Sequence, residues 1–369
     1  MAVARQPETL SLYPGEVLDT IAGFPTIYHY QPADNPEAAE ASKPLVVCIP
    51  GALHLARIFY GGHQGHRAND FLAHWLSKLG FGVLSLSYPV ETTSSTMPLT
   101  AAAFRLQDWG RQAAATTKKV IEQKSLATRS VVLLSWSMAG RMVVPFNIAA
   151  KELGLDVKQM IALAASPGIS SIRPVSPGII CTPAGYFNVP PRLENFYDQL
   201  NAMKPLNNNQ ETIPRDIYFR EYLGGTPINL IGLRLKHDGS GAFVQDEKTH
   251  EEDSHVFDMA NAPFTSAISH LDIEDASHAL GDKATWGFLL TYKLESMIGK
   301  QGLAKIKGTP KWPQVLDLVH SAPARLTVYI DGNHFFFVGE TSARKTADMV
   351  AKLLEEGASI RRELSALLA

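Results

Sequence analysis

The chain has 369 residues, of which 45% are hydrophobic, so it can form one large domain or two ordinary ones with a substantial core. Its 34 basic and 36 acidic residues give a net charge of −2, which provides no electrostatic footprint for nucleic acid. No run of 18 apolar residues predicts a membrane span, and the first residues lack the pattern of a signal peptide. The two cysteines, Cys48 and Cys181, are too few for a disulfide framework. We therefore expect a cytoplasmic protein that neither binds nucleic acid nor spans a membrane.

Short apolar runs alternate with longer stretches of helical periodicity along the first half of the chain. The run at 45–49 is continuously apolar, as is typical of a strand buried on both faces of a sheet. The same patterns predict two strands within 9–30, strands at 81–88, 131–134 and 160–164, and helices at 69–80, 99–124 and 142–153. Strands that alternate with helices indicate an α/β fold with a mostly parallel central sheet covered on both faces.

This alternation stops after residue 169. Residues 170–262 are rich in proline, asparagine and charged residues with interspersed aromatics, and we interpret them as a cap inserted after the sixth core strand. The alternation then returns with a strand at 264–270, helices at 283–299 and 313–321, a strand at 325–330 and a long helix from 342. The sequence therefore predicts a core in two parts, 1–169 and 263–369, and an inserted cap or lid, 170–262.

The most informative motif is the sequence SWSMAG at 135–140, which lies between a predicted strand and a predicted helix. A serine flanked by small residues at a tight strand-to-helix turn is typical of a nucleophile elbow, in which the hydroxyl stands clear of the sheet. Ser137 is therefore the candidate nucleophile, and Ser135 and Ala139 occupy the positions where only small residues fit. Because the usual pattern has glycine at both positions, the sequence is a variant of it.

Around this motif the chain resembles the α/β-hydrolase superfamily, over residues 9–169 and 264–369. The resemblance rests on three local matches in the order nucleophile, acid, histidine. It implies a serine hydrolase that needs no cofactor, and it assigns the backbone N–H of Met138 to the oxyanion hole.

The candidate base lies in the sequence DGNHFF at 331–336, directly after the last predicted strand. The superfamily places its catalytic histidine in the loop after that strand. The resemblance therefore makes His334 the group that takes the proton of Ser137 and returns it to the leaving group.

The candidate acid follows the strand after the cap. In the superfamily it commonly lies about nine residues past a proline that starts this strand; here Pro263 takes that place, and Asp272 lies at the matching position. Asp275 is the first alternative, since the turn could extend to it, and Asp282 is the second. Any of these carboxylates could instead cap the following helix.

The oxyanion loop is expected at 50–54, with the sequence PGALH, where the superfamily usually has His-Gly in place of Pro50-Gly51. The residue after the glycine normally supplies the second backbone donor, which points to Ala52, or to Leu53 in a different register. We expect substrate contacts from three residues of these loops, His54, Leu53 and Trp136.

Two histidine clusters, one at 54–74 and one at 270–278, lack the ligand spacing of a zinc signature, so we expect no metal site. The favoured function is a serine hydrolase that cleaves an ester, lactone or thioester of a small apolar molecule. An acyltransferase with the same Ser-His-Asp site and a non-catalytic ligand-binding protein of the same fold remain as alternatives. Neither the substrate nor the oligomeric state follows from the sequence.

Overall fold

The computed structural model describes residues 12–34, 43–92, 96–169, 180–232, 235–238, 240, 242–246 and 248–369. Its central feature is an eight-stranded sheet with the order β1-β2-β4-β3-β5-β6-β12-β13. The strands are β1 (Glu16–Ile21), β2 (Phe24–Gln31), β3 (Leu45–Ile49), β4 (Val83–Ser87), β5 (Ser130–Trp136), β6 (Asp156–Leu163), β12 (Thr265–His270) and β13 (Thr327–Ile330). β2 pairs antiparallel with β1 and β4, and every other pair in this sheet is parallel. The predicted fold class, a mostly parallel sheet flanked by helices, is confirmed.

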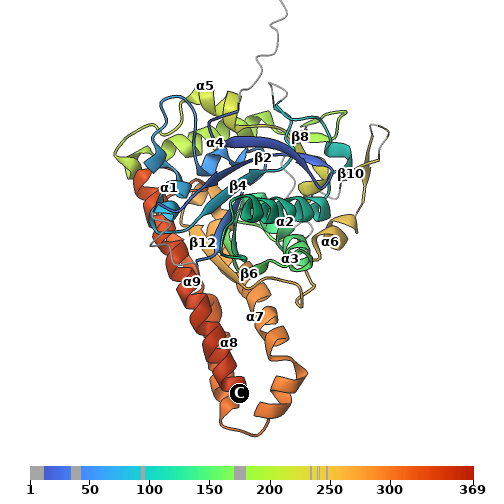
Figure 1. Cartoon of the computed structure of the whole chain (residues 1–369), viewed down its shortest axis with the longest axis vertical. Helices are drawn as coiled ribbons and strands as arrows, with labels where there is room; N and C mark the ends of the chain where they lie inside the picture. Colours follow the sequence, from blue (N-terminus) through green and yellow to red (C-terminus); the bar gives the residue numbers. More distant parts are fainter. Residues whose placement is uncertain are drawn as a thin grey trace, which may run out of the picture.

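Helices lie on both faces of this sheet (Figure 1). They are α1 (Leu72–Lys78), α2 (Leu106–Gln123), α3 (Val143–Glu152), α7 (Ala276–Ile306), α8 (Lys311–Arg325) and α9 (Glu340–Leu368). Every residue of β3 and β4 is buried, which explains the continuous apolar run of β3. α2 begins seven residues later than predicted, because residues before it form a short 3₁₀ turn and the Asp108 carboxylate accepts a hydrogen bond from the Arg105 N–H at the helix start.

Between β6 and β12 the chain leaves the central sheet. The described residues there form β7 (Ile180–Cys181), β8 (Tyr186–Asn188), α4 (Pro190–Ala202), α5 (Arg215–Ile217), the π-helical turn η6 (Tyr218–Tyr222), β9 (Thr226–Pro227), β10 (Leu235–His237), β11 (Phe243–Gln245) and α6 (Thr249–Ser254). Their strands make two small sheets separate from the central one. We call the described residues of 180–262 the insert; residues 170–179, where the predicted cap begins, lie outside the described residues.

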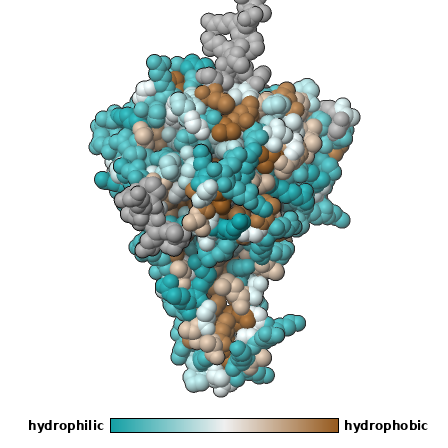
Figure 2. Space-filling model, in the orientation of Figure 1, coloured by the Kyte–Doolittle hydropathy of each residue, from teal (hydrophilic) through white to brown (hydrophobic). Residues whose placement is uncertain are grey.

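Helices α7, α8 and α9 extend beyond the sheet as a projection (Figure 1). α7 and α8 are both longer than the helices predicted at 283–299 and 313–321. α7 is interrupted at Gly299, whose φ of +60° is accessible to glycine. Figure 2 shows hydrophobic surface on this projection, and Leu303 and Trp312 are two of its exposed apolar residues. Among the described residues, no helix combines the length and apolar character that a membrane crossing requires.

Candidate active site

The predicted nucleophile lies at a strained turn. β5 ends at Trp136, and Ser137 begins a 3₁₀ turn that leads into α3. The φ of Ser137 is +55°, a left-handed backbone that non-glycine residues seldom adopt and that is often found at functional sites. A Cβ at Gly51 would lie 2.7 Å from the Ser137 Cβ, so the neighbouring loop packs directly against the serine.

Close packing explains why the residues beside Ser137 are small. Ser135 and Ala139 are fully buried on either side of Ser137. A Cβ at Gly140 would lie 2.5 Å from the Ser166 carbonyl oxygen. In this variant, therefore, glycine is required one position later than in the usual pattern, where the backbone after the elbow passes close to the loop after β6.

Ser137 opens onto a cavity of about 480 Å³. The core side of its wall includes Ala52, Met138, Asp275 and His334. The insert supplies the rest of the wall with apolar and polar side chains, among them Phe187, Val189, Arg192, Asn195, Phe196 and Gln199. The cavity thus brings the candidate nucleophile, base and oxyanion residues to one surface beneath the insert.

His334 and Asp275 form a close pair at the edge of this cavity. Nδ1 of His334 lies 2.8 Å from Oδ2 of Asp275, although the alignment is not that of a hydrogen bond. Among the described residues Nε2 of His334 has no hydrogen-bond partner, so it is not bonded to Ser137 in this structure. Catalytic hydrogen bonds are often long or poorly aligned without substrate, and both residues line the same cavity.

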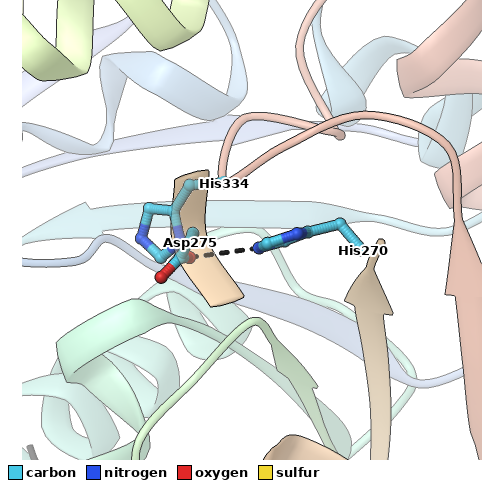
Figure 3. A group of neighbouring side chains, drawn as sticks. All are labelled: His270, Asp275 and His334. Atoms are coloured by element: carbon cyan, nitrogen blue, oxygen red, sulfur yellow. Dashed lines mark hydrogen bonds and ion pairs between the residues drawn. The ribbon is translucent and has the colours of Figure 1, made fainter. Parts of the chain in front are cut away.

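A second histidine holds the same carboxylate oxygen. Asp275 lies between the rings of His270 and His334 (Figure 3), and Nε2 of His270 is 3.1 Å from Oδ2 of Asp275. Nδ1 of His270 accepts a hydrogen bond from the Asp272 N–H at 3.3 Å. Because that nitrogen is an acceptor, the proton of the neutral ring is on Nε2, and His270 donates to Asp275.

Burial and charge set the protonation states of this group. Burial is the largest influence on His334 and lowers its pKa to about 4, against the opposing attraction of Asp275. Burial alone would raise the pKa of Asp275, but the charge of His334, the hydrogen bond from His270 and the close contact with His334 outweigh it and hold that pKa below its usual range. Near neutral pH the pair is therefore a carboxylate beside a neutral imidazole, the state that a general base requires.

The expected acid, Asp272, does not take this position. Its carboxylate accepts a hydrogen bond from the Glu274 N–H at 2.7 Å and caps the 3₁₀ turn η8 (Ile273–Asp275). β12 ends at His270, close to where it was predicted, but this turn carries the chain three residues further before a carboxylate faces His334. Asp275, the first alternative, makes the contact; Asp282, the second, pairs with His278 at 2.8 Å.

The two expected oxyanion residues, Ala52 and Met138, both line the cavity beside Ser137. The alternative donor, Leu53, does not fit, because its N–H donates to the Thr226 hydroxyl at 2.7 Å. The backbone geometry thus favours the register in which Ala52 is the donor.

The three expected substrate contacts lie behind the cavity wall. His54, Leu53 and Trp136 are at most 1% exposed, and none is among the described residues that line the cavity. The indole N–H of Trp136 instead donates to the His334 carbonyl oxygen at 3.1 Å, which ties the elbow to the histidine loop. The positions next to a motif are therefore structural here, because tight turns bury the neighbours of the residue that they expose.

Sequence reasoning missed several polar residues of the cavity. His278, at the start of α7, and Arg141, one helical turn after the nucleophile, both line it. Arg192 and Asn195 of α4 enter from the insert. The spacing from Ser137 to Arg141 could have indicated a residue on the same side of the turn, but no local pattern marked the residues of α4.

A metal ion is the other species that this site could hold. The ligand atoms of His270, Asp275 and His334 lie within 4.8 Å of one another. The same nitrogen and oxygen atoms already form the contacts described above, and these contacts account for the arrangement without an ion.

No family model matches the sequence, and no curated protein matches it. Among solved structures, the chain is similar to MenH from S. aureus, with 13% identity and a TM-score of 0.42 over 90% of this chain and 98% of that one. It is similar to a hyperthermophilic esterase from Pyrobaculum calidifontis, with 14% identity and a TM-score of 0.44 over 96% and 83%. It is also similar to a soluble variant of monoglyceride lipase from Saccharomyces cerevisiae, with 10% identity and a TM-score of 0.43 over 97% of this chain and 99% of that one. Likenesses of this size carry no argument about function, so the strand order and the elbow of the chain itself define its fold.

Proposed function

We propose that this chain, which has the α/β-hydrolase fold, is a serine hydrolase that cleaves an ester, lactone or thioester through an acyl-enzyme on Ser137. One observation carries the proposal: Ser137, on a left-handed backbone, and the His334–Asp275 pair line the same cavity. A nucleophile, a base and a carboxylate that orients the base are the parts that serine acyl transfer needs.

In this mechanism Nε2 of His334 takes the hydroxyl proton as the Ser137 oxygen bonds to the substrate carbonyl carbon. The backbone N–H groups of Ala52 and Met138 stabilise the negative charge on the carbonyl oxygen. The bond to the leaving group then breaks, and His334 returns the proton to that group. Water, deprotonated by His334, releases the acid from Ser137 in the second half of the reaction, while Asp275 stabilises each imidazolium that forms.

The residues of the cavity wall add detail to the substrate class expected from the sequence. Phe187, Val189 and Phe196 offer an apolar surface, which suits the predicted small apolar group. Arg141 and Arg192 also line this cavity; the Arg141 guanidinium donates to the Ile231 carbonyl oxygen, and that of Arg192 lies 5.1 Å over the Phe196 ring. We infer a substrate whose apolar part also carries a carboxylate or phosphate, the groups that guanidinium recognises best.

Labelling with a fluorophosphonate probe, followed by peptide mass spectrometry, tests the nucleophile. We expect one adduct, on Ser137, and its absence from His334→Ala, which lacks the base. An unlabelled wild-type protein that nevertheless binds hydrophobic esters would support the non-catalytic alternative instead.

Substrate class is tested by product analysis over matched esters and thioesters, with and without a terminal carboxylate. We expect kcat/KM to favour the charged members, and Arg192→Gln to reduce that preference. Adding alcohols or amines to the same assay separates hydrolysis from acyl transfer, because a transferase forms the new ester or amide in preference to the free acid.

A further inference from the structure

The oxyanion loop, residues 50–54, and the adjoining Leu55 are bonded to the insert along their backbone. The N–H of Leu55 donates to the Tyr222 carbonyl at 2.9 Å, and the N–H of Gly224 donates to the Leu53 carbonyl at 3.0 Å. These two bonds form an antiparallel bridge between a core loop and a segment almost 170 residues further along the sequence. The loop is therefore one side of a joint between core and insert.

A side-chain relay supports the same loop from the π-helical turn η6. Nδ1 of His54 lies 2.8 Å from the Ala52 carbonyl oxygen, and Nε2 of His54 lies 2.7 Å from the Tyr218 hydroxyl. A carbonyl oxygen can only accept, so the proton of His54 is on Nδ1. Burial lowers the pKa of His54 to about 3, so the ring is neutral and Nε2 accepts from Tyr218. In this relay, therefore, the Tyr218 hydroxyl donates to His54, and His54 donates to the Ala52 carbonyl oxygen.

A second relay runs through Thr226 at the next strand of the insert. The Leu53 N–H donates to the Thr226 hydroxyl oxygen at 2.7 Å. The Tyr88 hydroxyl donates to the Gly51 carbonyl at 2.8 Å, and its oxygen lies 3.0 Å from that of Thr226. Since Tyr88 has one proton, which the carbonyl takes, Thr226 donates to Tyr88. Thr226 thus bridges two peptide groups that flank Ala52.

The loop needs such support because its backbone is unfavourable. The φ of Leu53 is +66°, in the left-handed region that a branched side chain avoids. Four of the five loop residues are buried, and Ala52 alone of the five is partly exposed, at the cavity. Release of the bonds would allow Leu53 to return to an ordinary conformation, which would turn the adjoining peptide groups.

We propose that Tyr218 and Thr226 are positioning residues of the oxyanion hole, acting through His54 and Leu53 to hold Ala52 at the cavity. This inference rests on the proposed serine mechanism. It assigns to the insert a role beyond forming the cavity wall: the insert fixes the geometry of a core loop, so this joint stays closed during turnover. π-helical turns such as η6 are frequent at functional sites, in line with this role.

The first test removes the Tyr218 hydroxyl in Tyr218→Phe. Loss of a whole oxyanion donor costs about 10² to 10³ in rate, so a displaced donor should lower kcat about tenfold, with KM for p-nitrophenyl butyrate changed less than twofold. Tyr60→Phe is the matched control, because it removes another buried tyrosine hydroxyl. That hydroxyl donates to the Glu16 carboxylate at 2.6 Å rather than to His54. The control should keep wild-type kcat even where its melting temperature falls.

The second test uses Thr226→Val, which keeps the shape but removes the acceptor for Leu53, and Thr226→Ser, which keeps the hydroxyl. A trifluoromethyl ketone places an oxyanion in the hole after addition of Ser137, whereas the corresponding trifluoromethyl alcohol is neutral, cannot add Ser137 and forms none. We expect the valine variant to bind the ketone about tenfold more weakly, at unchanged affinity for the alcohol. The serine variant should bind both like the wild type.

The outcomes separate this inference from the proposed function. Absence of Ser137 labelling and of ester hydrolysis in the wild type would remove both proposals. A labelled, active wild type with equal kcat in Tyr218→Phe and Tyr60→Phe, or with unchanged ketone affinity in Thr226→Val, would overturn the positioning role alone. If Tyr218→Phe and Thr226→Val fail to fold, Thr226→Ser with reduced ketone affinity would contradict it as well.

Discussion

Two loops at the carboxyl ends of the central sheet supply the site, and they differ in how they are held. The oxyanion loop after β3 is buried except at Ala52 and is bonded to the insert through backbone and side chains. The acid turn after β12 lies at the surface, where Leu271 is 65% exposed and Ile273 83% exposed. In the proposed mechanism the first loop acts through its backbone, whereas the second acts through a single carboxylate.

This difference explains why the oxyanion loop tolerates an unusual sequence, whereas the sequence of the acid turn does not identify the carboxylate that contacts His334. Backbone donors do not depend on the side chain, so Pro50 can replace the usual histidine as long as Gly51 leaves room for Ser137. A carboxylate must arrive at one point in space, and a short turn with three acidic residues offers several candidates. We therefore expect substitutions of neighbouring residues in the exposed turn to differ most strongly in their effects on kcat.

The largest expected effect is on Ser137, the proposed nucleophile. Ser137→Ala should lower turnover by about four to six decades, because members of a catalytic triad act as one unit. Ser135→Ala is the matched control, since its buried hydroxyl has no hydrogen-bond partner among the described residues and lies outside the cavity lining. Initial rates of ester hydrolysis measure both variants. Retention of more than a tenth of wild-type activity in Ser137→Ala would exclude Ser137 as the nucleophile.

The acid turn gives the next largest effect and the sharpest contrast between neighbours. Asp275→Asn should lower kcat by about four decades, as expected when the carboxylate that orients the base is lost. Asp272→Asn should change kcat less than threefold, because asparagine also accepts the capping hydrogen bond. Circular dichroism should show both variants folded. The reverse ranking would restore Asp272 as the acid and contradict the pairing of Asp275 with His334.

The order of strands and helices could be predicted because burial imposes period and composition on the sequence, as in the fully apolar β3. The positions of Ser137 and His334 beside one cavity could be predicted because each follows a recognisable strand, and the elbow accepts few residue types. Asp275 could not be separated from Asp272, since the choice depends on one 3₁₀ turn that the local sequence does not specify. The contribution of α4 and η6 could not be predicted either, because it arises from contacts between distant segments.

A smaller effect is expected where His270 supports the acid turn. His270→Leu removes the donor to Asp275 and should lower kcat about tenfold at unchanged KM, since hydrogen bonds to charged groups contribute about 1.5 to 3 kcal/mol. His270→Gln can place an N–H near the original Nε2 and should recover most of this loss. Steady-state kinetics on both variants, with melting temperatures as a check on folding, test whether His270 acts through its hydrogen bond to Asp275. Equal losses in leucine and glutamine would show that His270 serves packing alone.

The smallest expected effect concerns pH, and it follows from the burial of His334. His334 must be neutral to accept the proton of Ser137, and burial lowers its pKa to about 4, while Asp275 opposes this shift and His278 and His270 reinforce it. The rate of fluorophosphonate labelling should therefore fall less than twofold between pH 7 and pH 5, and steeply only below about pH 4. An ordinary histidine with a pKa of about 6.5 would instead lose about 25-fold over the same interval. Circular dichroism at both pH values controls for unfolding, and a 25-fold fall in a folded protein would show that the base is more exposed to water than His334 is.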